Sequence, residues 1–341
     1  MSKRLTGLIC ALALLLSLAG CAAPPKEATS QIFAMDTFMN LTVYGKGTEV
    51  SAETALDQLE DTIYALENDL SVTREGSDIH KLNTAGGESV EVGYAAAGLL
   101  AGALELCEQT GGALDVTLYP AVKAWGFTTG ENRVPEVEEL AQLADRVDYS
   151  AVELDGQTVT LPAGMELDLG AVAKGYVGDR LAEEMKGYPA LLDLGQSTIV
   201  AIGTKPDGSA WRIGIQDPAG TDYLGVLELN DRSMGSSGNY QRWFEENGVR
   251  YGHIIDPDTA APAHSGLAGV TVVSDSALLC DGLSTALFVM GLEDAADHWR
   301  EYRDFEAIFI EDSGKITITA GLKDSFSLTG AYKDREVTVL E

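Results

Sequence analysis

The chain has 341 residues, of which 53 are acidic and 23 are basic, so its formal net charge at pH 7 is -30. This excess of negative charge argues against nucleic acid as a partner, because nucleic-acid binding depends on neutralising phosphates with Lys and Arg. A phosphorylated ligand would need a local device, such as a metal ion, a helix N-terminus or a few placed Lys residues.

Residues 1–20 have the features of a secretory signal peptide. Lys3 and Arg4 precede an apolar run from Leu8 to Leu16, which is too short to span a membrane. The run ends in Leu-Ala-Gly-Cys21, which resembles a bacterial lipobox. This resemblance implies cleavage before Cys21, lipid on its thiol and an anchor of acyl chains in the cell membrane, facing the extracytoplasmic side. The alternative is an ordinary signal peptide in which Cys21 has no role.

The rest of the chain divides into a short tether and a folded part. Residues 21–30, which include Pro24 and Pro25, are expected to form the lipidated Cys and a flexible tether. Residues 31–341 are long enough for one large domain or two closely packed lobes. Cys107 and Cys280 are isolated in helical patterns, so we expect buried thiols and no disulfide framework.

Helical and strand patterns are grouped along the chain and do not alternate strictly. Apolar residues at intervals of three and four predict a first helix at residues 51–70, with Ser51 as its N-cap. Further helices are expected at residues 95–109, 135–144, 172–186, 277–290 and 295–302, and residues 112–127 are expected to be an irregular loop. Strands are expected at residues 152–161, 166–169, 190–194, 211–216, 225–229, 269–273, 307–310 and 316–320. This grouping favours an α+β fold with antiparallel-rich sheets and packed helices.

A strand-to-helix junction at residues 166–179 is a candidate ligand site. The strand pattern ends at Leu169, a Gly turn follows, and the next helix begins with Lys174 and Gly175. Such a junction offers free backbone N–H groups, the positive end of a helix dipole and a full positive charge. It lacks the spacing of a P-loop, and the alternative is an ordinary turn with a solvated Lys174.

The segment that follows Val249 carries a second set of polar residues. His253 lies in an expected strand that ends at Asp256, so it is either a hydrogen-bonded structural residue or an acid–base group. Asp281 and Thr285 are one helical turn apart and project from one face. Two such oxygens would make half of a magnesium site, which usually keeps waters or phosphates in its other positions. The alternative is that Asp281 caps the helix and Thr285 bonds back to it.

Two other segments give weaker signals. Met35 opens the folded part and is expected either to pack in the core or to form the wall of a pocket. The glycine-containing segment at residues 234–240 is expected to be a polar turn, which either presents backbone donors to a ligand or is a plain hairpin loop.

Eight short segments together have a more specific pattern than any one of them. In chain order they are Met35-Asp-Thr37, Gly-Ala-Leu-Asp115, Trp-Gly-Phe127, Leu-Asp-Leu-Gly170-Ala-Val-Ala-Lys-Gly-Tyr, Ile-Gly-Ile-Gln-Asp-Pro218, Ser-Ser-Gly-Asn-Tyr240, His-Ile-Ile-Asp-Pro257 and Asp281-Gly-Leu-Ser-Thr285. This set resembles the FAD:protein FMN transferases of the ApbE type, over roughly residues 32–320.

The resemblance implies a magnesium-dependent enzyme with an ApbE-like mixed fold. FAD would be its substrate, and FMN would pass through a phosphoester bond to a Ser or Thr of a target protein, with release of AMP. The implied acceptors are membrane subunits of ion-pumping redox complexes, which a lipid-anchored enzyme could reach.

The resemblance also assigns roles to residues of this chain. Magnesium would be held by the side chains of Asp281 and Thr285 and by the backbone carbonyl of Ala171. Lys174, His253 and Asp256 are the implied catalytic residues. The implied FAD contacts are Met35, Ala113, Leu114, Asp115, Lys174, Asp179, His253 and Thr259.

Two segments depart from the family pattern. Gly195-Gln196-Ser197 stands where Gly-Gly-Asn is common, and Ser71-Val72-Thr73 stands where an aromatic residue is common. Three alternatives therefore stay open: a magnesium-dependent FAD pyrophosphatase, a non-catalytic flavin-binding lipoprotein, and a solute-binding lipoprotein of a transporter. The last would have two similar lobes, which the sequence pattern does not indicate.

Overall fold

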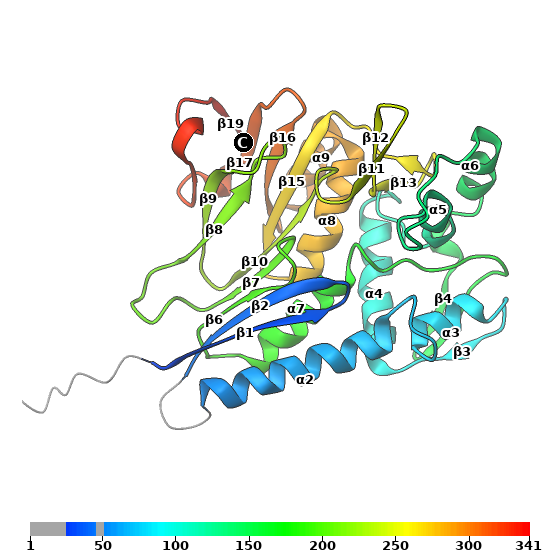
Figure 1. The fold of residues 1–341 in the computed structure, drawn as a ribbon, viewed down its shortest axis with the longest axis horizontal. Coiled ribbons are helices and arrows are strands. Elements are labelled where there is room, and N and C mark those ends of the chain that lie inside the picture. The colour runs from blue at the N-terminus through cyan, green and yellow to red at the C-terminus, as the bar shows by residue number, and fades with distance from the viewer. Residues whose placement is uncertain (1–24, 46–50) are drawn as a thin grey trace, which may run out of the picture.

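The computed structural model describes residues 25–45 and 51–341. Within them, nine strands form one large sheet in the order β1-β2-β6-β7-β10-β15-β16-β17-β19, antiparallel throughout except for the pair β17 and β19. These strands are β1 (Glu27–Ala34), β2 (Thr37–Tyr44), β6 (Ala190–Asp193), β7 (Thr198–Ile202), β10 (Arg232–Ser237), β15 (Leu267–Ser274), β16 (Glu306–Glu311), β17 (Ile316–Thr319) and β19 (Val337–Leu340). The expected α+β fold is therefore confirmed (Figure 1).

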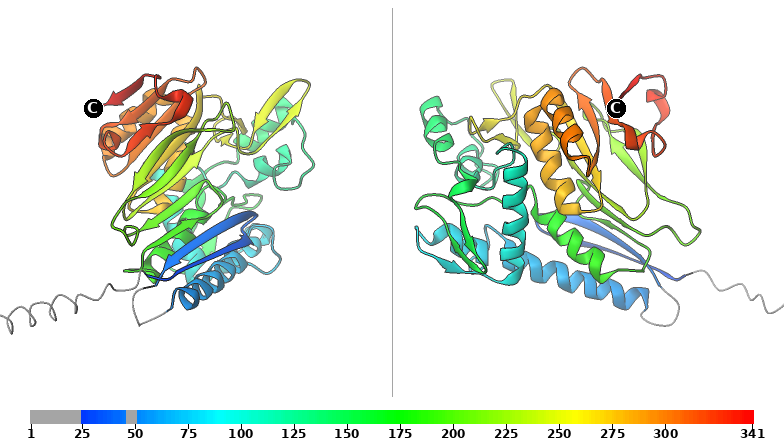
Figure 2. Two further views of the ribbon diagram at one scale, coloured as in Figure 1. Left: turned by 60° about the vertical axis from the view of Figure 1, so that its left-hand side comes forward. Right: turned by 180° about the vertical axis from the view of Figure 1, so that it is seen from behind.

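Helices cover one face of this sheet, and a small second sheet packs on the other face. The helices are α2 (Ala52–Leu70), α4 (Tyr94–Gln109), α7 (Ala173–Glu184), α8 (Ala277–Met290) and α9 (Leu292–Tyr302); the view from behind in Figure 2 shows α7, α8 and α9 in front of the strands. The second sheet contains β8 (Trp211–Gln216), β9 (Tyr223–Leu229) and β18 (Phe326–Leu328). Buried apolar side chains of both sheets form one cluster between them, separate from the main core beneath the helices.

The remaining elements form a mostly helical region beside the large sheet. It contains α3 (Asp78–Thr84), α5 (Tyr119–Trp125), α6 (Val137–Ala144), η1 (Tyr149–Ala151), β3 (Val90–Glu91), β4 (Glu153–Asp155) and β5 (Thr158–Thr160). Two hairpins, β11 (Trp243–Glu246) with β12 (Val249–Gly252) and β13 (Ile255–Asp256) with β14 (Ala261–Pro262), reach toward this region. Two short helices, η2 (Ala320–Leu322) and η3 (Gly330–Tyr332), lie near the C-terminus.

Several sequence-based expectations are corrected by the structure. Residues 166–169 form no strand, and Glu166 makes only an isolated bridge to Leu118. Residues 152–161 form the β4–β5 hairpin, and the expected loop at 112–127 contains α5. The expected polar turn at residues 234–240 is in part strand, because its first four residues belong to β10.

The first described strand changes the expected boundary of the tether. β1 begins at Glu27, so the last four residues of the expected tether are part of the large sheet. The expected signal peptide and Cys21 lie outside the described residues. Among the residues that are described, no helix combines the length and the apolar character needed to cross a membrane.

The tip of the β1–β2 hairpin places Met35 at the edge of the main core, half-buried against it. Met35 and Asp36 have φ values of 50° and 60°, the left-handed conformation that two-residue hairpin turns require. The backbone N–H of Met35 donates to Oε1 of Glu67 on α2 at 2.8 Å. This contact fixes the tip against the helix layer, and Met35 both packs against the core and lines a pocket, so the two expectations hold together.

Candidate functional site

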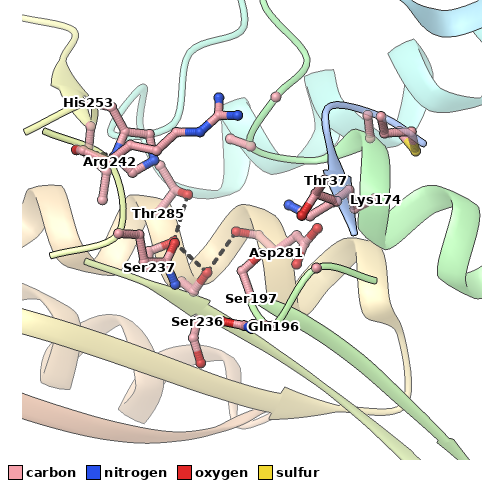
Figure 3. A pocket seen from close by; sticks show the side chains of 18 of the residues that line it. Thr37, Lys174, Gln196, Ser197, Ser236, Ser237, Arg242, His253, Asp281 and Thr285 are labelled. Atoms are coloured by element: carbon pink, nitrogen blue, oxygen red, sulfur yellow. Dashed lines mark hydrogen bonds between the residues drawn. The ribbon is translucent and has the colours of Figure 1, made fainter. Parts of the chain in front are cut away.

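A cleft of about 1340 Å³ lies where the large sheet, the helical region and the β11–β12 hairpin meet. Pockets for small ligands usually enclose about 300–1,000 Å³, so this cleft has room for an extended ligand of dinucleotide size. Its lining includes nine of the twelve expected site residues: Met35, Ala113, Leu114, Asp115, Ala171, Lys174, His253, Asp281 and Thr285. Several of these side chains point into the cleft in Figure 3.

Asp281 is held inside α8 by close packing at two glycines. The helix is capped by Ser276, whose hydroxyl accepts from the N–H of Leu279, so the alternative expectation that Asp281 is the N-cap is wrong. A Cβ atom at Gly175 would lie 2.3 Å from the carbonyl O of Ala277, and one at Gly235 would lie 2.5 Å from that of Cys280. Both glycines are therefore needed for α7 and β10 to approach α8, which sets the depth of Asp281 in the site.

The Asp281 carboxylate is buried, with 6% of its surface exposed. Its Oδ2 accepts from the N–H of Gly175 at 2.7 Å, and the Thr198 hydroxyl lies 2.8 Å from Oδ1 and 3.0 Å from Oδ2. Burial raises the pKa of Asp281 to about 6, although the charge of Lys174 and these hydrogen bonds act in the opposite direction. A cation beside this carboxylate would favour its charged form, as expected of a metal ligand.

Thr285 lies one turn further along α8 and belongs to a group of hydroxyls. Oγ of Ser237 on β10 lies 3.0 Å from Oγ1 of Thr285 and 2.8 Å from Oγ of Ser284; Figure 3 shows these contacts beside Asp281. Thr285 therefore pairs across to the sheet, whereas the alternative expectation had its hydroxyl bonded back to its own helix. Asp281, Thr285 and Ala171 offer hard oxygen donors on one cleft, which suit magnesium.

This donor set is incomplete without a ligand. Among the described residues, no group of three or more His, Cys, Asp and Glu side chains could hold a metal ion. Magnesium is commonly bound by one or two carboxylates together with substrate phosphates. The residues present therefore fit a magnesium ion whose coordination is completed by waters or by the phosphates of a ligand.

Lys174 supplies positive charge at the start of α7, as the sequence predicted. The helix begins at Ala173, and Lys174 lies in its first turn at the cleft. Its charge acts on the pKa values of both Asp281 and His253, so the three groups are within electrostatic reach of one another. The helix dipole adds to this charge.

His253 directly follows β12 and lines the cleft. Its Nδ1 lies 3.2 Å from the carbonyl O of Arg242, a contact that fits Nδ1–H donating and leaves Nε2 as an acceptor. Burial, together with the charges of Arg242 and Lys174, lowers the pKa of His253 to about 4. The imidazole is therefore neutral at pH 7 and can accept a proton.

Asp115 shapes the far wall of the cleft. Its carboxylate accepts from the N–H and the hydroxyl of Thr117 at 2.7 and 2.6 Å and from the N–H of Tyr149 at 2.9 Å. These contacts hold the turn that carries Ala113 and Leu114 into the lining. Burial raises the pKa of Asp115, and the three hydrogen bonds oppose that shift.

Three expected site residues lie outside the described lining of the cleft. Asp179 accepts from the hydroxyl of Ser276 and from the N–H groups of Ala277 and Leu278 at 2.5–3.1 Å, so it stabilises the start of α8. Asp256 and Thr259 accept from backbone N–H groups within the turn that joins β13 to β14. Their oxygens accept these local hydrogen bonds, and the contacts of the three residues with FAD or the reacting atoms, which the resemblance implies, stay predictions.

The structure also adds residues that sequence patterns missed. Thr198 contacts Asp281 from a strand whose residues are all buried; a polar residue opening such an apolar run was the only available signal. Arg242 lines the cleft and forms an ion pair with Asp36, with Nη2 and Oδ2 2.5 Å apart. The two residues are 206 positions apart, so no local pattern could connect them.

Both departures from the family pattern also line the cleft. Ser71, Val72 and Thr73 follow α2, and Gln196 occupies the turn between β6 and β7 with a φ of 66°. A left-handed conformation favours glycine. The glycine in the family pattern therefore fits the backbone found at Gln196.

Comparisons with known proteins agree with this site. The model of the ApbE family matches residues 35–309. A protein of Treponema pallidum named FAD:protein FMN transferase is 33% identical, over 89% of this chain and 90% of the relative. One of the same name from Haemophilus influenzae is 32% identical, over 93% and 96%.

Solved structures give the same result. The ApbE protein of Thermotoga maritima has a TM-score of 0.81 at 29% identity and covers 87% of this chain and 98% of its own. The flavin transferase ApbE of Vibrio cholerae has a TM-score of 0.79 at 27% identity and covers 89% and 100%. The fold is thus that of a flavin-transferase type of protein. The chain belongs to the ApbE family, which confirms the resemblance found in the sequence and the enzyme class, a transferase.

Proposed function

We propose that this chain is a magnesium-dependent FAD:protein FMN transferase that attaches FMN to a Ser or Thr of a target protein and releases AMP. One observation carries the proposal. Lys174 at the start of α7, Asp281 within α8 and His253 after β12 line the same cleft, although each comes from a different part of the chain. The names of the curated relatives support the choice of FAD as donor and of a protein as acceptor.

The transfer needs one bond to form and one to break. The acceptor hydroxyl oxygen bonds to the phosphorus of the FMN half of FAD, and the bond from that phosphorus to the bridging oxygen breaks. AMP leaves with the electron pair of the broken bond. The hydroxyl proton passes to Nε2 of His253, whose low pKa keeps it unprotonated at neutral pH.

The transfer also requires that the negative charge of the FAD pyrophosphate be neutralised. Lys174 lies in the first turn of α7 at the cleft and would bind phosphate oxygens, supported by the positive end of the helix dipole, whereas the N–H groups of Ala173 and Gly175 are already bonded within the chain. Asp281, Thr285 and the carbonyl of Ala171 would hold magnesium. When bound, the metal would neutralise charge on the transferring phosphoryl group.

The proposed location rests on the N-terminal sequence, and the proposed acceptor class rests on the family resemblance. Lys3, Arg4, the short apolar run and Cys21 support a lipid-anchored protein on the extracytoplasmic side of the cell membrane. An enzyme tethered there would meet membrane-embedded acceptors, such as subunits of redox pumps. The anchor and the membrane acceptor are part of the proposal.

The test uses the full chain in detergent with FAD, magnesium and a candidate acceptor subunit. AMP release is measured in parallel with covalent flavin fluorescence on a denaturing gel. The wild-type chain is expected to give both AMP and covalently bound flavin, and Asp281→Ala is expected to give neither. AMP with only free FMN would instead indicate an FAD pyrophosphatase, and FAD binding without AMP would indicate a non-catalytic flavin-binding protein.

A further inference from the structure

Thr198 lies behind the candidate metal ligand Asp281 and outside the lining of the cleft. It is the first residue of β7 and has no exposed surface, whereas its neighbours Ser197 and Ile199 line the cleft. Its hydroxyl reaches both carboxylate oxygens of Asp281, at 2.8 and 3.0 Å. It is therefore placed to act on the carboxylate and not on a bound ligand.

The carboxylate needs this second contact to keep one orientation. The N–H of Gly175 holds Oδ2 at 2.7 Å, but a single hydrogen bond leaves the side chain free to turn about that contact. Thr198 approaches from β7, whereas Gly175 approaches from α7, so the two donors together fix the carboxylate plane. An ionised carboxylate has about four lone-pair sites, and two donors leave room for a cation.

Thr198 is itself rigid. Its carbonyl accepts from the N–H of Leu194 at 2.9 Å, and its backbone lies opposite Gly235 in the β7–β10 pair. A β-branched side chain in a buried strand has restricted rotation about its first torsion. The hydroxyl thus has a fixed position before any ligand binds.

We infer that Thr198 is a positioning residue for the metal site, which orients Asp281 so that its free lone pairs face the cation. The inference rests on the proposed function, because that proposal assigns magnesium to Asp281. A purely structural Thr198 would lower stability when replaced but would leave the metal affinity of the folded protein unchanged. A positioning role and a purely structural role therefore predict different dissociation constants for the metal ion when Thr198 is replaced.

The test is a titration of the full chain in detergent with Mn²⁺ alone, which prefers the same octahedral oxygen sites as magnesium; free Mn²⁺ is measured by electron paramagnetic resonance. Loss of a group that orients a metal ligand typically weakens affinity about 10- to 100-fold, so Thr198→Val should raise the Kd by that factor. Thr198→Ser keeps the hydroxyl and should restore the Kd to within about threefold of wild type.

Thr319→Val is the matched control. Thr319 is equally buried, its hydroxyl accepts from the N–H of Ala307 of β16 at 2.9 Å, and it is not among the residues that line the cleft. This variant should lose stability and keep the wild-type Kd. The inference would be overturned if Thr198→Val bound Mn²⁺ with a Kd within twofold of wild type, or more tightly than wild type. It would also be overturned if Thr198→Ser bound Mn²⁺ as weakly as Thr198→Val. If the wild-type chain and Asp281→Asn bind Mn²⁺ equally poorly, the metal assignment in the proposed function fails as well.

Discussion

Replacing Asp281 by Asn should stabilise the metal-free protein and abolish its metal site. The carboxylate is buried and its pKa is raised to about 6, mainly by burial. The folded chain therefore holds a charged group in surroundings that disfavour the charge. Asn has nearly the same shape, keeps an oxygen to accept from Gly175, and carries no charge to bury.

The size of the effect follows from the pKa and depends on pH. A group whose folded pKa lies above its ordinary value stabilises the folded state at low pH and loses that stabilisation as pH rises through the folded value. A pKa of about 6 against an ordinary 3.8 corresponds to about 3 kcal/mol at pH 8, because each tenfold change in proton affinity is worth about 1.4 kcal/mol. At pH 5, where the folded group is mostly protonated, about half of this penalty remains.

The assay is urea unfolding of the wild type and of Asp281→Asn at pH 5 and pH 8, with a chelator present. The variant should be the more stable protein, by a larger margin at pH 8 than at pH 5. Asp57→Asn changes an exposed carboxylate on α2 and should have little effect at either pH. An Asp281→Asn protein that is no more stable than wild type at pH 8, or a margin that does not change with pH, would refute the reasoning.

Three further predictions concern single residues. His253→Ala should lower the rate of transfer about 10²- to 10⁴-fold with little change in FAD affinity. Because the pKa of His253 is about 4, protonation of His253 should lower the wild-type rate only as the pH drops toward 4. A loss of rate centred near pH 6.5 would contradict the assignment of His253 as the base. Asp179→Ala should lower the unfolding free energy by about 1–2 kcal/mol, the usual cost of losing a helix cap; an unchanged urea midpoint would show that the contact is not needed. Gln196→Gly should stabilise the chain by up to about 1 kcal/mol, because it relieves a left-handed non-glycine residue with a φ of 66°; a clear loss of stability in the same assay would show that the Gln196 side chain contributes more than its backbone strain.

Periodic and local signals in the sequence were sufficient for most helices. The N-cap at Ser51 is confirmed, since its hydroxyl accepts from the N–H of Thr54 at 3.1 Å. The helix at residues 277–290 has the expected bounds. Cys107 and Cys280 are buried and free, as expected. Each of these features depends on residues close together in the chain, which is why patterns could predict them.

Features that depend on distant contacts could not be predicted. Residues 166–169 have the composition of a strand, but their backbone bonds to a loop: the N–H of Asp168 donates to the carbonyl of Val116 at 2.7 Å. The resemblance implies an FAD contact for Asp179, but no local pattern indicates that its carboxylate lies on the face of α7 that meets the start of α8. The role of Thr198 could not be predicted because its partner Asp281 lies 83 residues further along the chain.

The most direct test of the proposed function is the fate of the two halves of FAD. The full chain in detergent is incubated with FAD, magnesium and a candidate acceptor subunit, and AMP is quantified together with flavin covalently bound to the acceptor. Equal amounts of AMP and bound flavin, both absent with a chelator and in Asp281→Ala, are predicted. AMP formed with no flavin on any acceptor tested, or bound flavin formed equally well without magnesium, would contradict the account.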